Sequence, residues 1–154
     1  MLKKFISRKG YTLVELAVVM LIISLVAAVA VPNLNKSYAR RSLQSAALQL
    51  QQEIRTLGQI SMQRETSGYY ITFDLDNDSY TIHGPDGART VAVPAGVDIT
   101  HTNFNNHVIN FSLRGTPTAG GLVTLQSDVT GDFKYVIVTP ITGRTRVSDT
   151  PSNS

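Results

Sequence analysis

The sequence contains no cysteine and no tryptophan among its 154 residues, and only 16% of these residues are charged. Without cysteine the chain cannot form disulfide bonds, thiolate metal sites or a cysteine nucleophile. A G-x-S-x-G nucleophile elbow, a P-loop and an H-E-x-x-H zinc motif are also absent. Apolar residues make up 42% of the chain, which is enough to build a core. We therefore expect one folded domain that is not an enzyme and needs no metal or cofactor.

The formal net charge of +3 is unevenly distributed along the chain. The first ten residues carry four basic side chains and no acidic one, so the sum for residues 11–154 is 10 − 11 = −1. The basic character belongs largely to the N-terminal segment, and it gives no argument by itself for a nucleic-acid partner.

A long apolar segment follows these basic residues. From Leu16 to Val31 every residue except Ser24 is apolar. Counted from Tyr11, the segment would form a helix of about 31 Å, which just crosses a hydrocarbon core of about 30 Å. Basic residues before the segment predict that the N-terminus stays in the cytoplasm and the rest lies outside.

Three interpretations fit this arrangement. The segment could be a signal peptide cleaved after Ala30, an uncleaved signal anchor, or an apolar helix whose leader is cut between Gly10 and Tyr11. Glu15 discriminates among them, because a carboxylate near the centre of a membrane helix costs about 2.5–3.5 kcal/mol. The first two interpretations give this carboxylate no use. Its alternative role is that of a side chain reaching the lipid headgroups near the helix end.

The octapeptide Lys-Gly-Tyr-Thr-Leu-Val-Glu-Leu, which begins at Lys9 and is followed by the apolar run and Pro32, resembles the N-terminus of type IV pilins and pseudopilins. The resemblance implies that a prepilin peptidase cuts after Gly10 and methylates the amine of Tyr11, where the family usually has phenylalanine. It also implies that Glu15 guides subunit docking, because a neighbour's N-terminal amine would make the buried carboxylate tolerable. Glu15 and Pro32 are thus the expected assembly residues.

The helical pattern continues beyond the membrane segment. An apolar stripe with steps of 4, 3, 4, 3 and 4 predicts an amphipathic helix, and the polar residues between its members predict a solvated face. The stripe comprises Leu43, Ala47, Leu50, Ile54, Leu57 and Ser61, and the polar face comprises Gln44, Gln49, Gln51, Gln52, Arg55 and Gln59. We expect one helix from about residue 12 to about residue 65, bent or locally opened at Pro32.

The remaining sequence alternates short β-branched and aromatic runs with turns. It predicts an antiparallel sheet or small sandwich, with the helix covering one face, in an α+β fold. The expected strands are 69–74, 79–83, 89–93, 97–100, 107–113, 122–126, 134–139 and 144–147. The expected segments are a leader (1–10), a transmembrane and filament-core helix (11–32), its amphipathic continuation (33–65), a β-rich head (66–147) and a flexible tail (148–154).

Three segments of the head resemble the FimT/GspH group of minor pilins and pseudopilins. These segments are Phe111–Gly115, Gly120–Leu125 and Tyr135–Arg146. The group has β-rich heads, whose C-termini often end in a similar pattern of strand, glycine and arginine.

Arg144 and Arg146 are the candidate binding residues of the head. Alternate residues of a strand face the same side, so two guanidinium groups about 7 Å apart could contact neighbouring DNA phosphates. Gly143 would permit close backbone approach, and a Gly-Arg-x-Arg pattern is associated with DNA binding in FimT-type pilins. The alternative is an edge strand protected from aggregation by its charges. Because residues 66–154 sum to 5 − 8 = −3, any DNA contact would be local and salt-dependent.

Metal binding has weaker support in the sequence. The series Asp74-x-Asp76-x-Asp78 resembles the opening of a calcium loop, but Ser79 stands in the glycine position and Pro85 in that of the bidentate glutamate. A solvated hairpin turn is the favoured interpretation. The three histidines, at positions 83, 101 and 107, show no ligand spacing with carboxylates.

The sequence is therefore interpreted as a FimT-like minor type IV pilin that enters or primes a pilus filament, with DNA as a further partner. The alternatives are a GspH-like minor pseudopilin of type II secretion and, from another class, a secreted β-domain protein cleaved after Ala30. The expected partners are prepilin peptidase, other pilins or pseudopilins, the inner-membrane assembly platform, and lipid before assembly. The expected location is the bacterial inner membrane, with a single span and the head in the periplasm.

Overall fold

The computed structural model describes residues 12–140 and 142–151. Within them the chain forms one α-helix, a short 3-10 turn and eight strands, which confirm the expected α+β class. The helix is α1 (Leu13–Arg64), the 3-10 turn is η1 (Asn105–His107), and the strands are β1 (Tyr70–Asp74), β2 (Ser79–Gly84), β3 (Gly87–Ala92), β4 (Val97–Thr102), β5 (Val108–Asn110), β6 (Gly121–Ser127), β7 (Phe133–Val138) and β8 (Thr145–Ser148). The chain divides into two compact units, one up to Asn35 and one from Lys36 onward.

The N-terminal unit contains the apolar part of α1. It includes a window with a mean hydropathy of 2.8 that is long and apolar enough to cross a membrane, and none of this window is buried in the protein. Every side chain from residue 12 to residue 38 is exposed. An apolar surface of this extent fits membrane anchoring, because water solvates it poorly.

Helix α1 continues through Pro32. Proline has no backbone N–H, so the carbonyl group of Ala28 loses its usual helical partner at this point. The residues on both sides nevertheless remain helical, so Pro32 does not end the helix.

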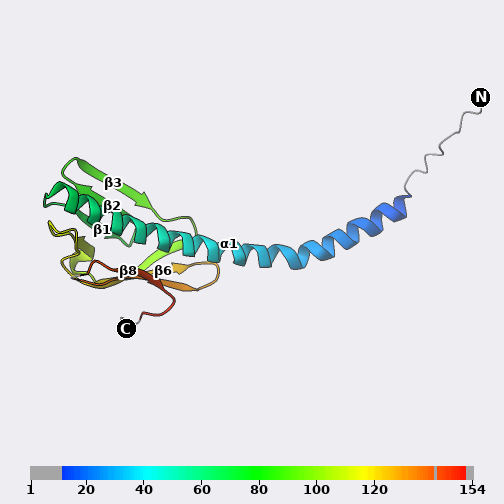
Figure 1. The fold of residues 1–154 in the computed structure, drawn as a ribbon. Coiled ribbons are helices and arrows are strands. Elements are labelled where there is room, and N and C mark those ends of the chain that lie inside the picture. The colour runs from blue at the N-terminus through cyan, green and yellow to red at the C-terminus, as the bar shows by residue number, and fades with distance from the viewer. Residues whose placement is uncertain (1–11, 141, 152–154) are drawn as a thin grey trace, which may run out of the picture. The chain divides into compact units, whose positions relative to one another are not determined.

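In the second unit, α1 packs through the predicted stripe. All six stripe residues, from Leu43 to Ser61, are buried, and Ala46 and Gly58 join them. Figure 1 shows this part of α1, coloured cyan to green, running along the strands of the head. The stripe is buried because its 3–4 spacing places every member on one face of the helix, as predicted.

Two four-stranded antiparallel sheets complete the head. Their strand orders are β3-β2-β1-β5 and β4-β6-β7-β8. Both sheets contribute inward side chains to one apolar core with α1, for example Ile71 from β1 and Leu125 from β6, which are fully buried. The expected antiparallel strands thus form two sheets that share a core with the helix.

Each expected strand occurs, with bounds that differ by one to three residues from the prediction, and two of these differences have a structural reason or consequence. The fifth covers only Val108–Asn110 instead of 107–113, because His107 has a left-handed φ of 56° and belongs to the preceding turn. After it the chain turns at Ser112, whose N–H donates to the carbonyl oxygen of Thr116 at 2.9 Å. The eighth strand begins at Thr145 and leaves Arg144 in the preceding loop.

The β1–β2 hairpin has the expected turn at residues 75–78. Asp74 accepts hydrogen bonds from the backbone and side chain of Asn77, and the side-chain bond is the largest cause that lowers the pKa of Asp74. The Asp78 carboxylate accepts a bond of 2.9 Å from the N–H of Ile99, in the other sheet. Asp74 therefore stabilises the turn itself, and Asp78 joins the turn to β4 of the other sheet.

The carboxyl group of Asp98, in β4, has a pKa raised from 3.8 to about 6. The largest cause is a side-chain hydrogen bond with Asp128, followed by desolvation and by the negative charge of Asp78. The folded protein holds this proton more tightly than the unfolded chain does. Its contribution to stability is therefore complete below about pH 3.8 and is lost as the pH rises through about 6.

Replacing Asp98 by asparagine is expected to raise the free energy of unfolding at about pH 7 and to change it less at about pH 4. Denaturant unfolding of residues 36–154 at both pH values measures this difference. Asp74→Asn serves as a control with the opposite trend, because the lowered pKa of Asp74 contributes stability that is lost as the pH falls. An equal effect of Asp98→Asn at both pH values would contradict the raised pKa of Asp98.

Candidate functional site

Glu15 lies in the first turn of α1. Its backbone N–H donates to the hydroxyl oxygen of Thr12 at 3.2 Å, and the N–H of Leu16 donates to the carbonyl oxygen of Thr12 at 3.1 Å. Thr12 is thus the N-cap, and Thr-x-x-Glu is the pattern of a capping box. The sequence interpretation overlooked this local role of Glu15, although the pattern stands directly before the apolar run.

The expected cleavage and methylation residues, Gly10 and Tyr11, lie outside the described residues, as does the leader. The other expected assembly residue, Pro32, lies within α1 and is exposed. Glu15 is exposed as well, so its carboxylate is open to a partner.

The C-terminal arginines flank a residue that is almost completely buried. Thr145 is 1% exposed, while Arg144 is exposed and Arg146 is partly buried. Because successive residues of a strand point to opposite faces, Arg146 in β8 points away from the core side that Thr145 occupies, whereas Arg144 precedes the strand and its direction does not follow from strand alternation. Gly143 has a left-handed φ of 64°, which side-chain-bearing residues rarely adopt. The glycine is therefore needed for the turn itself.

Two side chains of α1 hold this C-terminal segment. Gln51 Nε2 donates to the carbonyl oxygen of Thr145 at 2.7 Å, and Arg55 Nη2 donates to the same oxygen at 2.5 Å. Both belong to the helix face predicted to be solvated; Arg55 is exposed as predicted, whereas Gln51 is half-buried. A helix-to-strand contact across about ninety residues leaves no signal in local periodicity.

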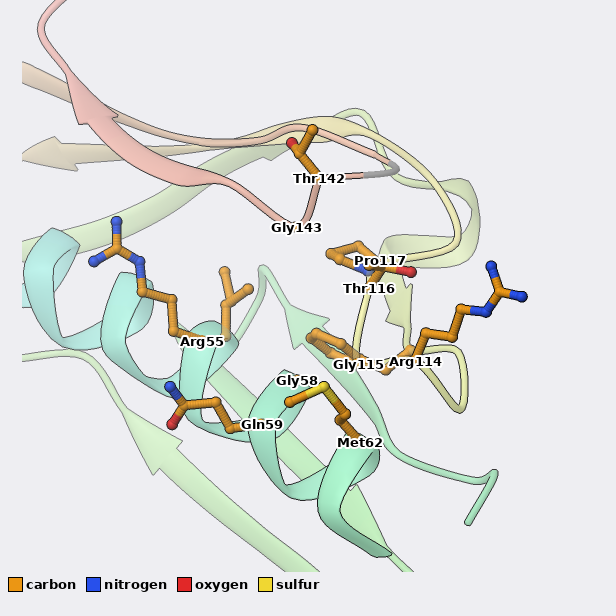
Figure 2. A pocket seen from close by; sticks show the side chains of 12 residues that line it. Arg55, Gly58, Gln59, Met62, Arg114, Gly115, Thr116, Pro117, Thr142 and Gly143 are labelled. Atoms are coloured by element: carbon orange, nitrogen blue, oxygen red, sulfur yellow. The ribbon is translucent and has the colours of Figure 1, made fainter. Parts of the chain in front are cut away.

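A pocket of about 340 Å³ lies beside Gly143, between α1 and the loops at residues 114–117 and 142–143. We call it the Gly143 pocket, and Figure 2 shows it from close by. Ile54, Phe111 and Pro117 give it buried apolar walls. Arg55 and Arg114 lie on opposite sides of it in Figure 2.

Close packing of two backbones shapes one wall of this pocket. A Cβ atom on Gly58 would lie 2.5 Å from the carbonyl oxygen of Gly115, which is far inside contact distance. The Ser61 hydroxyl donates to the Ser112 carbonyl oxygen at 2.8 Å and fixes the same loop to the helix. Gly58 therefore allows the 112–116 turn to lie directly on α1.

The arginines around the pocket differ from four other cations of the second unit. Among the described residues, Arg55, Arg114 and Arg144 have no carboxylate within ion-pair distance. Four other basic side chains do have acidic partners, namely Arg40 with Asp132, Arg64 with Asp86, Arg89 with Glu53 and Lys134 with Asp149. Residues 36–154 carry ten basic and ten acidic side chains, so the position of the charges decides the electrostatics.

The histidines do not form a site. His83 stacks on Tyr70 with ring centroids 4.2 Å apart, and its Nε2 lies 3.1 Å from the Thr72 hydroxyl. In the part of the chain that the structure describes, no group of three or more His, Asp or Glu side chains could hold a metal ion.

Residues 6–31 match the family model of the prokaryotic N-terminal methylation motif. The match includes Gly10, Tyr11 and Glu15. No curated protein and no solved structure matches the chain. Proteins with this motif are structural pilin-type proteins and not enzymes. The chain therefore carries the N-terminal methylation motif that is characteristic of type IV pilins and pseudopilins, and its long apolar helix fits that motif.

Proposed function

We propose that this protein is a FimT-like minor type IV pilin, anchored in the bacterial inner membrane by one helix with its head in the periplasm. The observation that carries the proposal is the methylation motif on an apolar helix, joined to a β-rich unit with its own core. A GspH-like pseudopilin of type II secretion is the alternative, because the head pattern resembles both. The genes that neighbour this one, for pilus or for secretion components, would discriminate between them.

In this proposal the leader orients the precursor, and prepilin peptidase cuts between Gly10 and Tyr11. The apolar helix then leaves the lipid for a bundle of equivalent helices, guided by Glu15. Both environments are apolar, so the hydrophobic effect favours neither strongly. Extraction therefore depends on the assembly platform and on specific contacts between subunits.

Mass spectrometry of the mature N-terminus tests the proposal. We expect a methylated Tyr11 as the first residue, and in a strain without prepilin peptidase we expect the intact precursor. A chain that begins at Val31 would instead identify a secreted protein cleaved by signal peptidase, and it would refute the pilin function.

DNA binding is a second proposed function of the head. It is favoured by the exposure of Arg144, which has no carboxylate partner among the described residues, and by its place beside Arg146 after the Gly143 turn. Guanidinium groups suit phosphate contacts, and such contacts weaken steeply with salt. Each subunit would contribute a small site to a filament with many copies.

The double variant Arg144→Ala/Arg146→Ala is expected to weaken DNA binding and to reduce the slope of log K against log [salt] by about 1.4–1.8 for two lost phosphate contacts. Fluorescence anisotropy at several salt concentrations measures both quantities. Arg64→Ala/Arg89→Ala removes the same charge from two ion-paired arginines and is the matched control. Equal slopes for the two double variants would refute this DNA site.

A further inference from the structure

The Gly143 pocket combines apolar walls with cationic side chains. Its walls at Ile54, Phe111 and Pro117 are apolar, and Arg55 and Arg114 stand at its sides. A simple phosphate-binding surface needs only the cations. A simple apolar partner would gain nothing from them.

The positive charge around the pocket favours an anionic ligand. Arg55 and Arg114 have no carboxylate partner among the described residues, and neither does Arg144, which directly follows the pocket residue Gly143. The Arg55 guanidinium donates one hydrogen bond to the carbonyl oxygen of Thr145, which does not neutralise its charge. Arginine has further donors in a planar fork, so phosphate oxygens could still be bound.

The shape of the pocket adds a second requirement for the ligand, which is a flat ring. Its volume of about 340 Å³ is at the small end of the range for ligand pockets. Gly58, Gly115 and Gly143 present backbone instead of side chains, and Pro117 and Phe111 present rings. Such walls suit a flat ring. A nucleotide combines a flat ring with an anionic group and so meets both requirements, and along a strand only an unpaired base is free to enter a pocket.

We propose that the Gly143 pocket takes a base of single-stranded DNA, while the arginines around it hold the adjacent phosphates. This inference rests on the proposed DNA binding and narrows it to unpaired strands. Arg144 and Arg146 would then lie on the path of the same backbone. The pocket supplies contacts with the base that the two C-terminal arginines alone cannot supply.

The test measures the affinity of the full-length protein, in a nonionic detergent, for three ligands of equal length. They are an oligothymidylate, an abasic single strand with the same phosphates, and a duplex. We expect the oligothymidylate to bind about fivefold to tenfold more tightly than the abasic strand, the gain of placing about one base on apolar walls. The duplex is expected to bind more weakly than the oligothymidylate.

A matched pair of variants locates the effect in the pocket. Gln59 lines the pocket and is exposed, so Gln59→Glu places a carboxylate there, one helical turn from Arg55. Gln49→Glu makes the same charge change at an exposed position of α1 that lines none of the described pockets. We expect Gln59→Glu to reduce oligothymidylate affinity several-fold more than Gln49→Glu does.

The outcomes separate this inference from the proposed DNA function. Equal affinity for the oligothymidylate and the abasic strand, or equal effects of the two glutamate variants, would overturn the pocket and leave phosphate binding by the arginines intact. Absence of binding to all three ligands at low salt would overturn both. A preference for the oligothymidylate that Gln59→Glu abolishes and Gln49→Glu preserves would support both.

Discussion

Replacing Glu15 by glutamine is expected to leave the precursor inserted and processed, and to reduce its incorporation into filaments by about 100-fold or more. The resemblance to pilins gives Glu15 a docking role, and the structure places its backbone N–H in the N-cap hydrogen bond with Thr12, within the Thr-x-x-Glu pattern of a capping box. Glutamine separates the two roles, because it serves in a capping box nearly as well as glutamate but carries no charge.

The expected magnitudes decide between these roles. Loss of a favourable charge at a helix N-terminus costs about 0.3–1 kcal/mol, which is at most about fivefold in an equilibrium. Removal of one partner from a buried ion pair costs about 3–5 kcal/mol, because the other charge stays buried without compensation. A docking contact between the Glu15 carboxylate and a neighbour's N-terminal amine therefore predicts the much larger loss.

Quantification of the subunit in sheared filaments and in the membrane fraction measures this effect. Thr12→Ala is the matched variant, because it removes the cap and keeps the carboxylate. If Glu15→Gln assembles like the wild type while Thr12→Ala does not, the function of Glu15 is to start the helix, and the docking role is wrong.

Replacing Gly58 by valine is expected to lower the free energy of unfolding of residues 36–154 by about 2–3 kcal/mol. The new Cβ would lie 2.5 Å from the carbonyl oxygen of Gly115, so either the helix or the 112–116 turn must move. This turn is held by the hydrogen bond from Ser61 to Ser112 and cannot shift without losing it. The cost outweighs the modest gain in helix propensity from removing glycine, which is below about 1 kcal/mol.

Chemical denaturation of residues 36–154 measures the change, since every residue of the apolar core lies within this range. Gln49→Val places the same β-branched side chain at an exposed position of α1 and is expected to cost only a few tenths of a kcal/mol. Comparable stability of the two variants would show that the helix and the turn separate at little cost.

Much of the fold could be predicted from the sequence because it depends on local periodicity. The 3–4 stripe from Leu43 to Ser61 determines the buried face of α1, and the turn signals between short apolar runs determine the number and approximate bounds of the strands. The methylation motif could be identified for the same reason, since its residues are contiguous between positions 6 and 31.

Only the tertiary structure decided what lies around the C-terminal arginines. Gln51 and Arg55 have the pattern of solvated helix residues, yet both donate to Thr145, and Arg114 comes to the same pocket from a turn after β5. These contacts join segments distant in sequence, and one of them depends on the absence of a Cβ at Gly58. The sequence alone thus determined the long apolar helix and the approximate bounds of the strands, because the information for both is local. The pocket and its unneutralised charge result from packing between distant segments, and local periodicity carries no information about such packing.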